Sequence, residues 1–200
     1  MIIGLTGTYC AGKNFVSEIL EKHGLPVLDV DKLGHKVIET EKNAILETFG
    51  NDILNKDGVI NRKILGEKVF GNADKLAALE AIIHPAVNRE TEAWIREQKG
   101  SCVINAALLH RSSAFSELGA VILVRAPFLT RLIRAKKRDH LPWRDLIKRL
   151  RSQKLFTSQY STVKADIYRV ENPGCFGFFP GRTGKKTKAR IEEILSFLGL

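Results

Sequence analysis

The sequence predicts an α/β fold in which helices cover both faces of a five-stranded parallel sheet. Five short apolar runs, rich in β-branched residues, alternate with helical patterns, as buried parallel strands do. These runs lie near residues 1–6, 25–31, 101–105, 120–124 and 166–170. Residues 42–98 interrupt the alternation with helical patterns alone, which predicts a helical lobe inserted between the second and third strands.

The first strand leads directly into Gly7-Thr-Tyr-Cys-Ala-Gly12-Lys13-Asn14. Apart from its last residue, this segment fits G-x-x-x-x-G-K-[ST], a loop that binds phosphates through backbone N–H groups at a helix N-terminus. A helical pattern follows, and Lys13 is placed to reach a pair of β- and γ-phosphates. The alternative is a glycine-rich turn with a solvated lysine. We expect a nucleotide site made of Gly7, Thr8, Tyr9, Cys10, Ala11, Gly12, Lys13, Asn14 and Phe15.

Two carboxylates, Asp29 and Asp31, end the second predicted strand. In an open α/β sheet, ligands bind beyond the carboxyl ends of the strands, so we expect both side chains beside the phosphate-binding segment. Asp31 also suits the N-cap of the helix that follows, which is the structural alternative.

The inserted lobe combines a turn with several helices. The turn is predicted at residues 55–58, and an amphipathic helix follows at 61–70. Two further helices are predicted at 75–83 and 86–98. We expect His84-Pro85 to separate them, because the residue before a proline prefers an extended conformation.

Positive charge is concentrated after the fourth strand. The net charge is +10. A helix is predicted for 128–137, ending in Lys136-Lys137-Arg138-Asp139, and Arg131, Arg134 and Arg138 are spaced i, i+3 and i+7 on one helical face. After a break at 140–142, a second basic helix is predicted for 143–156. A mobile helix pair that brings arginines over a triphosphate excludes water and stabilises transferred charge.

A solvated basic face and a nucleic-acid surface are the alternatives for these arginines. The sequence has no pattern of aromatic and basic residues along strands for stacking bases, so we expect no specific nucleic-acid partner.

The rest of the composition predicts a cytoplasmic protein. No apolar run approaches membrane-spanning length, and the N-terminus has no signal-peptide pattern. Cys10, Cys102 and Cys175 form no C-x-x-C pair, which argues against a disulfide framework or a zinc site. Cys10, at a helix N-terminus, is either a thiol of lowered pKa or an inert small residue.

Several short motifs occur along the chain in a fixed order. They are Leu5-Thr6-Gly7, Leu28-Asp29-Val30-Asp31, Gly58-Val-Ile-Asn-Arg62 with Val69-Phe70, Ile83-His84-Pro85, Arg134 with Arg138-Asp139, Gln153, and Ala165-Asp166 with Asn172. Together they resemble the dephospho-CoA kinase family over roughly residues 3–172. No single motif is decisive, but the Asp-x-Asp strand end, the Asn-Arg helix start and the His-Pro break are fairly specific in combination.

The resemblance implies a three-layer P-loop kinase fold with a helical lid. It implies transfer of phosphate from ATP, with Mg²⁺, to the ribose 3′-hydroxyl of dephospho-CoA, the final step of coenzyme A synthesis. The implied parts are a nucleotide-binding core (1–31, 100–137 and 158–200), a lobe for the CoA precursor (32–99) and a lid (138–157). The implied catalytic residues are Asp31 as general base, with Lys13, Arg134 and Arg138. The implied ATP-binding residues include Asn172, and the implied acceptor-binding residues are Thr6, Asp31, Arg62 and His84.

Some positions depart from the family pattern, mostly at the metal and phosphate site. Asn14 replaces the Ser or Thr that binds Mg²⁺, so its amide oxygen becomes the candidate metal ligand. Thr8 and Cys10 replace glycines, and Asn105 and Arg111 replace two acids after the third strand. Two hypotheses follow. One is an active, diverged kinase in which Mg²⁺ is held mainly by the phosphates, water and Asp29 or Asp31, and the other is a kinase homologue that binds nucleotide with weak turnover. A different small P-loop kinase for nucleosides or nucleotides would also fit the motifs, and a basic nucleic-acid-binding P-loop protein would fit them less well.

Overall fold

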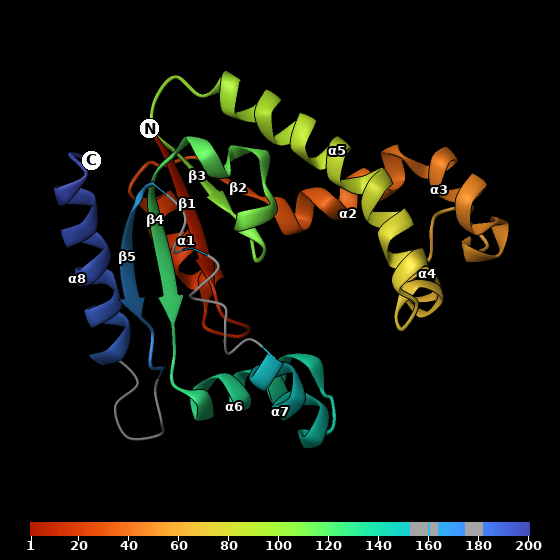
Figure 1. The fold of residues 1–200 in the computed structure, drawn as a ribbon. Helices are drawn as coiled ribbons and strands as arrows, with labels where there is room; N and C mark the ends of the chain where they lie inside the picture. The colour runs from red at the N-terminus through yellow and green to blue at the C-terminus, as the bar shows by residue number, and fades with distance from the viewer. Residues whose placement is uncertain (153–159, 161–163, 175–181) are drawn as a thin grey trace. The chain divides into compact units, whose positions relative to one another are not determined.

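The computed structural model describes residues 1–152, 160, 164–174 and 182–200 of the chain (Figure 1). These residues form two compact units. The first, the sheet unit, consists of Met1–Leu28 and Gln98–Leu200. The second, the helical unit, consists of Asp29–Glu97.

A single sheet organises the sheet unit. Its strands are β1 (Ile2–Gly7), β2 (Val27–Asp29), β3 (Cys102–Asn105), β4 (Leu118–Arg125) and β5 (Asp166–Glu171), in the order β2-β3-β1-β4-β5. Strand β1 pairs in parallel with β3 and β4, and β4 pairs in parallel with β5. The predicted α/β fold with a five-stranded parallel sheet is confirmed. The order puts β1, which leads into the glycine-rich segment, in the centre of the sheet.

One face of the sheet is covered by α1 (Lys13–Lys22) and α8 (Arg182–Phe197) (Figure 1). Apolar side chains of both helices pack with alternate residues of the strands, including Ile3, Leu5 and Val103. Each such fully buried aliphatic side chain stabilises the fold by roughly 1.5–3 kcal/mol. Because side chains alternate between the two faces along a strand, a polar strand residue can be assigned to one face from its position in this pattern.

The opposite face carries a compact segment after β3. It contains the short 3₁₀ helices η2 (Leu109–Arg111) and η3 (Ser113–Glu117). A Cβ added at Gly4 of β1 would lie 2.5 Å from Cδ2 of Leu109, so only glycine permits this close packing. The fully buried Tyr160 packs edge-on against His110 and Phe115 of the same segment.

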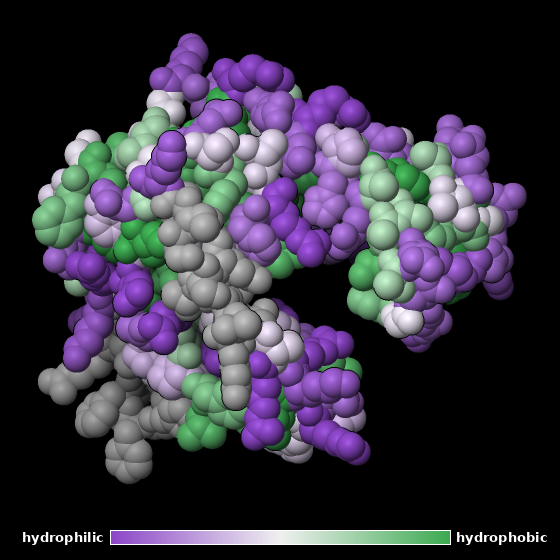
Figure 2. Space-filling model, viewed as in Figure 1, coloured by the Kyte–Doolittle hydropathy of each residue, from purple (hydrophilic) through white to green (hydrophobic). Residues whose placement is uncertain are grey.

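Two basic helices follow β4. They are α6 (Phe128–Asp139) and α7 (Trp143–Ser152), which pack against each other. Between them His140 adopts a left-handed conformation with φ of 54°, which ends α6 at the predicted break. Figure 2 shows mostly hydrophilic residues on the visible surface of this pair. The predicted helix at 143–156 is described only as far as residue 152, so its last residues lie outside the described part.

The helical unit has its own core. Its elements are α2 (Val30–Thr40), α3 (Lys42–Phe49), η1 (Asn51–Ile53), α4 (Arg62–Val69) and α5 (Ala73–Glu97). The core residues are Ile45, Phe49, Ile53, Ile60, Leu65 and Val69. The predicted turn at 55–58 is confirmed, because Asn55 Oδ1 accepts the N–H groups of Asp57 and Val59, and Gly58 has a φ of 73°. None of the helices in the described part of the chain has the length and hydropathy needed to cross a membrane.

Two predictions of local structure are wrong. The second strand is shorter than predicted, because helix α2 already starts at Val30 and takes Asp31 into its first turn. The predicted break at His84-Pro85 is absent, because α5 continues through Pro85. Pro85 is exposed, so water can satisfy the Ala81 carbonyl that lacks its helical partner, while the next residue, Ala86, is buried.

Replacing Pro85 with alanine should stabilise the helical unit. The Pro85→Ala variant restores one backbone hydrogen bond and removes a residue that disfavours a helix interior by about 3 kcal/mol. Since the native helix has already adapted to the proline, we expect a gain of about 1–2 kcal/mol in the free energy of unfolding. Urea unfolding followed by far-ultraviolet circular dichroism measures this gain. Glu90→Ala, on the exposed surface of the same helix, is the control and should change little. A lower midpoint for Pro85→Ala would contradict this explanation.

Candidate phosphate-binding site

Residues 7–13, which we call the phosphate loop, connect β1 to α1. A Cβ added at Gly7 would lie 2.7 Å from the Val124 carbonyl oxygen, so glycine permits close contact with β4. Gly12 has a φ of 94° and Cys10 a φ of 58°, a left-handed conformation that is uncommon outside glycine. The Ala11 N–H donates to the Thr8 carbonyl across 2.9 Å and tightens the turn. These features give the loop a curled backbone.

Helix α1 begins directly from this loop. Gly12 is its N-cap residue, no side chain caps it, and its first turn contains no acidic residue. Such an N-terminus combines directed N–H groups with the positive end of the helix dipole and favours an anion. Lys13, Asn14 and Phe15 form this first turn, and the latter two side chains are exposed.

Arg134 of α6 and Asn172, which follows β5, hold the loop by hydrogen bonds to its backbone carbonyl groups. Arg134 Nη1 donates to the Ala11 carbonyl across 2.9 Å and to the Cys10 carbonyl across 3.4 Å. Asn172 Nδ2 donates to the same Ala11 carbonyl across 2.9 Å, and Asn172 Oδ1 accepts from Arg134 Nη2 across 3.3 Å. Asn172 is buried, and its own backbone N–H donates to the Arg125 carbonyl. We call Arg134 and Asn172 the loop clamp.

The loop clamp fixes the direction of one peptide group. In a trans peptide, the C=O and N–H bonds point in opposite directions. Because the Ala11 carbonyl points toward Arg134 and Asn172, the Gly12 N–H points away from them. The clamp therefore orients a donor that a phosphate-binding loop requires.

The arginines of α6 face the same loop, as their spacing predicted. Burial raises the pKa of the Cys10 thiol, and the charges of Arg138, Arg134 and Arg131 oppose that rise. The hypothesis of a lowered Cys10 pKa is therefore wrong. Burial also lowers the pKa of Arg131, whose Nε and Nη1 are buried with no hydrogen-bond partner among the residues described. A desolvated guanidinium with unused donors favours an anion beside it.

Tyr9 links the loop to the C-terminal end of α6. Its phenol donates to the Asp139 carboxylate, and the Arg138 guanidinium lies 4.9 Å from the centre of its ring. Arg138 Nε donates to the same carboxylate across 2.7 Å. Arg138 is thus brought to the loop by contacts between two segments that are far apart in the chain.

Two polar residues of the central strands are buried. Thr6 is fully buried, and its hydroxyl lies 3.1 Å from the Tyr160 phenol oxygen. Asn105 is 1% exposed, and its Oδ1 has no hydrogen-bond partner in the described chain. Asn105 pairs in register with Leu5, so it lies on the face of the sheet that α1 covers.

The side chains of Asn14 and Asn105 fit a magnesium ion that takes most of its ligands from the substrate. The described residues contain no group of three or more His, Cys, Asp or Glu side chains able to hold a metal. The orphaned Oδ1 of Asn105 and the amide of Asn14 are hard, neutral oxygen donors, which Mg²⁺ accepts. Mg²⁺ commonly takes its other ligands from phosphates and water.

Other predicted site residues lie in the helical unit. Asp29 Oδ1 accepts the Lys32 N–H, so Asp29, rather than Asp31, is the N-cap of α2. Asp31 is exposed in the first turn of that helix. Arg62 is the exposed first residue of α4, behind the N-cap Asn61, and His84 lies half-buried within α5. Their roles, and that of Thr6, stay predictions.

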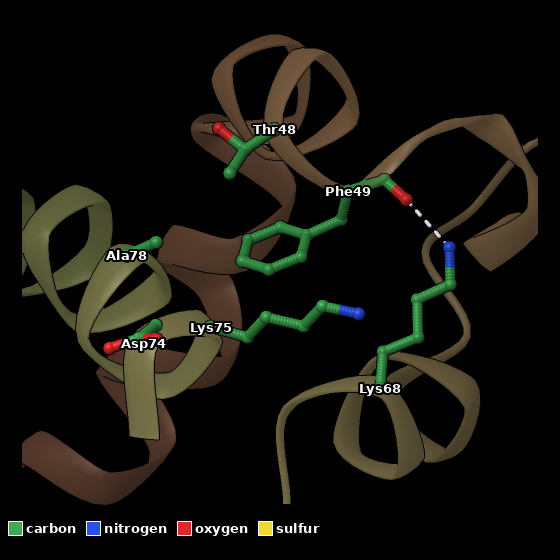
Figure 3. A pocket seen from close by; sticks show the side chains of 6 residues that line it. All are labelled: Thr48, Phe49, Lys68, Asp74, Lys75 and Ala78. Carbon is green, nitrogen blue, oxygen red and sulfur yellow. Dashed lines mark hydrogen bonds between the residues drawn. The ribbon is translucent and has the colours of Figure 1, made fainter. Parts of the chain in front are cut away.

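The helical unit also contains a cavity of about 270 Å³ (Figure 3). It is lined by Thr48, Phe49, Lys68, Asp74, Lys75 and Ala78, none of which is a predicted site residue. Lys68 is already engaged, because its ammonium donates to the Phe49 carbonyl and to Asp52. The cavity adds no chemistry to the predicted site.

Comparison with known proteins identifies the family. The family model CoaE, described as dephospho-CoA kinase, matches residues 1–172. The chain belongs to the dephospho-CoA kinase family. A dephospho-CoA kinase of Halalkalibacterium halodurans is 36% identical over 202 residues, which cover 98% of this chain and 95% of that protein. A dephospho-CoA kinase of Treponema denticola is 34% identical, covering 86% of this chain and 82% of its own length. The predicted family is therefore confirmed.

Solved structures agree on the fold. A crystal structure of TT1252 from Thermus thermophilus has a TM-score of 0.80 at 26% identity and covers 99% of this chain and 97% of that one. A shikimate kinase of Bacteroides thetaiotaomicron, at 12% identity, has a TM-score of 0.56 with 100% and 99% coverage. At that identity the likeness concerns the fold alone. It supports the three-layer P-loop kinase fold that the sequence resemblance implied.

Some residues of the site were not predicted to act together. The sequence predicts no role for Asp139, and it predicts Tyr9 as a site residue only through its place in the loop motif. Their contact joins segments 130 residues apart, which a local pattern does not reveal. For Arg131, the helical spacing predicted that it shares a helix face with Arg134 and Arg138. Only the structure shows that its Nε and Nη1 are buried with no hydrogen-bond partner among the described residues.

Substituting Gly12 should damage nucleotide binding more than folding. In Gly12→Ala, the new Cβ would lie 2.1 Å from Asn172 Nδ2, in a backbone conformation that alanine disfavours. We expect ATP affinity, measured by isothermal titration calorimetry, to fall at least about tenfold because the loop clamp is displaced. Gly24→Ala is the matched control beyond the other end of α1, with a φ of 82° and no atom within 4 Å of the new Cβ. It should destabilise the fold by about 1 kcal/mol and keep ATP affinity. Equal affinities for both variants would contradict the role of the clamp.

Proposed function

We propose that the chain transfers the γ-phosphoryl group of ATP to the ribose 3′-hydroxyl of dephospho-CoA, giving coenzyme A and ADP. The observation that carries this proposal is the clamped phosphate loop at the start of α1, in a chain that belongs to the dephospho-CoA kinase family. In this reaction, a bond forms between the 3′-oxygen and the γ-phosphorus. The bond from that phosphorus to the bridging β–γ oxygen breaks.

The donor side of the reaction uses the sheet unit. The phosphate loop, residues 7–13, surrounds the ATP phosphates, and Lys13 neutralises charge on the β- and γ-phosphates. Arg134 and Arg138 approach the loop from α6. Their guanidinium groups stabilise the negative charge that moves from the γ-phosphoryl group onto the departing ADP. Thr8, Phe15 and Asn172 complete the predicted ATP site, Asn172 through the loop itself.

We propose that ATP binds together with Mg²⁺, its usual counterion. Asn14 and Asn105 are the residues that would hold it, with the ATP phosphates and water as the remaining ligands. Bound there, it would offset negative charge on the phosphates.

The acceptor side uses the helical unit. Asp31 removes the proton of the 3′-hydroxyl as that oxygen attacks, the role of a general base. Its exposure in the first turn of α2 supports this role, because the carboxylate is accessible to a ligand. Arg62, His84 and Thr6 bind the acceptor, within a substrate lobe at 32–99.

Residues 138–157 act as a lid, of which 153–157 lie outside the described residues. The partners are ATP and dephospho-CoA, without a specific nucleic acid, and the enzyme works in the cytoplasm.

A nucleotide-binding homologue with weak turnover is the second candidate. The observation that favours it is the lack, within the described residues, of a group of three or more His, Cys, Asp or Glu side chains able to hold a metal. We favour the active enzyme because Mg²⁺ binds through substrate phosphates with few protein ligands in many kinases.

Removing the Asp31 carboxylate should abolish most of the turnover. A coupled assay of ADP formation with ATP, Mg²⁺ and dephospho-CoA should give a dephospho-CoA-dependent rate that falls about 10²–10⁴-fold in Asp31→Asn. Asp29→Asn removes the same charge two residues away. It keeps an N-cap of similar quality and should retain the rate within about threefold.

Three outcomes bear on the proposal. Coenzyme A formation confirmed by mass spectrometry, with loss in Asp31→Asn alone, supports it. ATP binding without coenzyme A formation would favour the homologue with weak turnover. Similar losses in both variants would contradict a specific role for Asp31.

A further inference from the structure

Tyr9 occupies a position where the phosphate-loop motif specifies no residue type. Its side chain nevertheless makes two long-range contacts with α6. The phenol donates to Asp139 Oδ2, and the ring faces the Arg138 guanidinium at 4.9 Å. Neither contact is required by the phosphate-binding backbone.

We infer that Tyr9 is a positioning residue that holds Arg138 at the phosphate loop through the Asp139 carboxylate. The effect on catalysis rests on the proposed function, whereas the linkage itself does not. We call Tyr9, Arg138 and Asp139 the tyrosine clasp.

The Asp139 carboxylate is shared between both partners. Arg138 Nε donates to Oδ1 across 2.7 Å and Nη2 to Oδ2 across 3.2 Å, a two-point pairing. The Tyr9 hydroxyl donates a hydrogen bond to Oδ2 as well. The Asp139 side chain is only 20% exposed, so this pair is less screened than an ordinary surface ion pair. One carboxylate thus ties the arginine to the tyrosine.

Without the clasp, Arg138 would have little to hold it in place. Its side chain is 60% exposed, and it lies at the last turn of α6, just before the left-handed His140. Long side chains in such positions sample many rotamers, and fixing them later costs entropy. The face of an aromatic ring attracts a guanidinium and limits these rotamers.

The tyrosine is itself anchored to the loop. The next residue, Cys10, is held in a left-handed conformation, and Arg134 binds the carbonyls of Cys10 and Ala11. The backbone at Tyr9 is therefore held in place, and the contacts of its side chain hold Arg138 near the loop. A cation positioned before the transition state stabilises charge without further reorganisation.

The clasp also reduces repulsion among like charges. The charges of Arg131, Arg134 and Arg138 all lower the pKa of the Cys10 thiol, so three guanidinium groups lie close enough to influence one residue of the loop. Asp139 is the carboxylate paired with Arg138 there. It offsets part of the repulsion that would drive Arg138 away from the loop.

A first experiment tests the linkage without any assay of turnover. Alkylation of Cys10 by iodoacetamide, followed by peptide mapping, reports how closely the end of α6 covers the loop. We expect the rate to rise several-fold in Tyr9→Leu and in Tyr9→Phe, which lacks only the hydroxyl. Tyr168→Phe, which removes a hydroxyl from β5, is the control and should match the wild type. Unchanged rates in both Tyr9 variants would overturn the linkage.

A second experiment tests whether Tyr9 acts through Arg138. In steady-state kinetics, Tyr9→Leu should lower kcat on the order of tenfold, with KM for ATP changed less than about threefold. Tyr9→Phe, which keeps the ring, should retain more activity. In an Arg138→Met background, Tyr9→Leu should cause no further loss, because the two residues act as a unit.

The outcomes separate the two ideas. An equal further loss in the Arg138→Met background, or a rise in kcat for Tyr9→Leu, would overturn the positioning role. Complete absence of turnover in the wild type would contradict the proposed function, and the alkylation rates would still decide the linkage.

Discussion

The site depends on one set of hydrogen bonds, those that the loop clamp makes to the phosphate loop. Arg134 and Asn172 both donate to the Ala11 carbonyl, and this fixes the direction of the Gly12 N–H. Arg134 approaches from α6 and Asn172 from the end of β5. The clamp therefore joins the central strand, the first helix and the arginine-bearing helix at one peptide. It also gives Arg134 a structural task in addition to its proposed effect on transferred charge.

The chemistry of this site is biased toward cations and neutral oxygen atoms. Three arginines of α6 act on Cys10, and two donors of Arg131 have no partner within the described part of the chain. The candidate magnesium ligands, Asn14 and Asn105, carry no charge. Such charge favours a nucleotide polyanion, and neutral amides would give Mg²⁺ fewer favourable contacts than carboxylates would. In the proposed reaction, the protein's own arginines would supply much of the positive charge that stabilises the transferred phosphoryl group.

The sequence predicted the sheet and the phosphate loop well, because both depend on local patterns. Apolar runs mark buried strands, and the glycine and lysine spacing marks the loop. It failed at Pro85, where the exposed side of a helix tolerates a missing hydrogen bond, and at the end of the second strand, where α2 already starts at Val30. The Tyr9–Asp139 contact was also beyond its reach, because it depends on tertiary packing. Burial likewise decided the Cys10 pKa against the effect of the nearby arginines, and a sequence pattern shows no burial.

The most direct test of this account is the affinity of ATP for Asn172→Asp, measured by isothermal titration calorimetry. The substitution keeps the size of the side chain and an oxygen for Arg134, but it removes the donor to the Ala11 carbonyl. We predict at least a tenfold loss of ATP affinity, equivalent to about 1.4 kcal/mol. An affinity within twofold of the wild type, in a variant that folds normally, would contradict the claim that the clamp orients the phosphate loop.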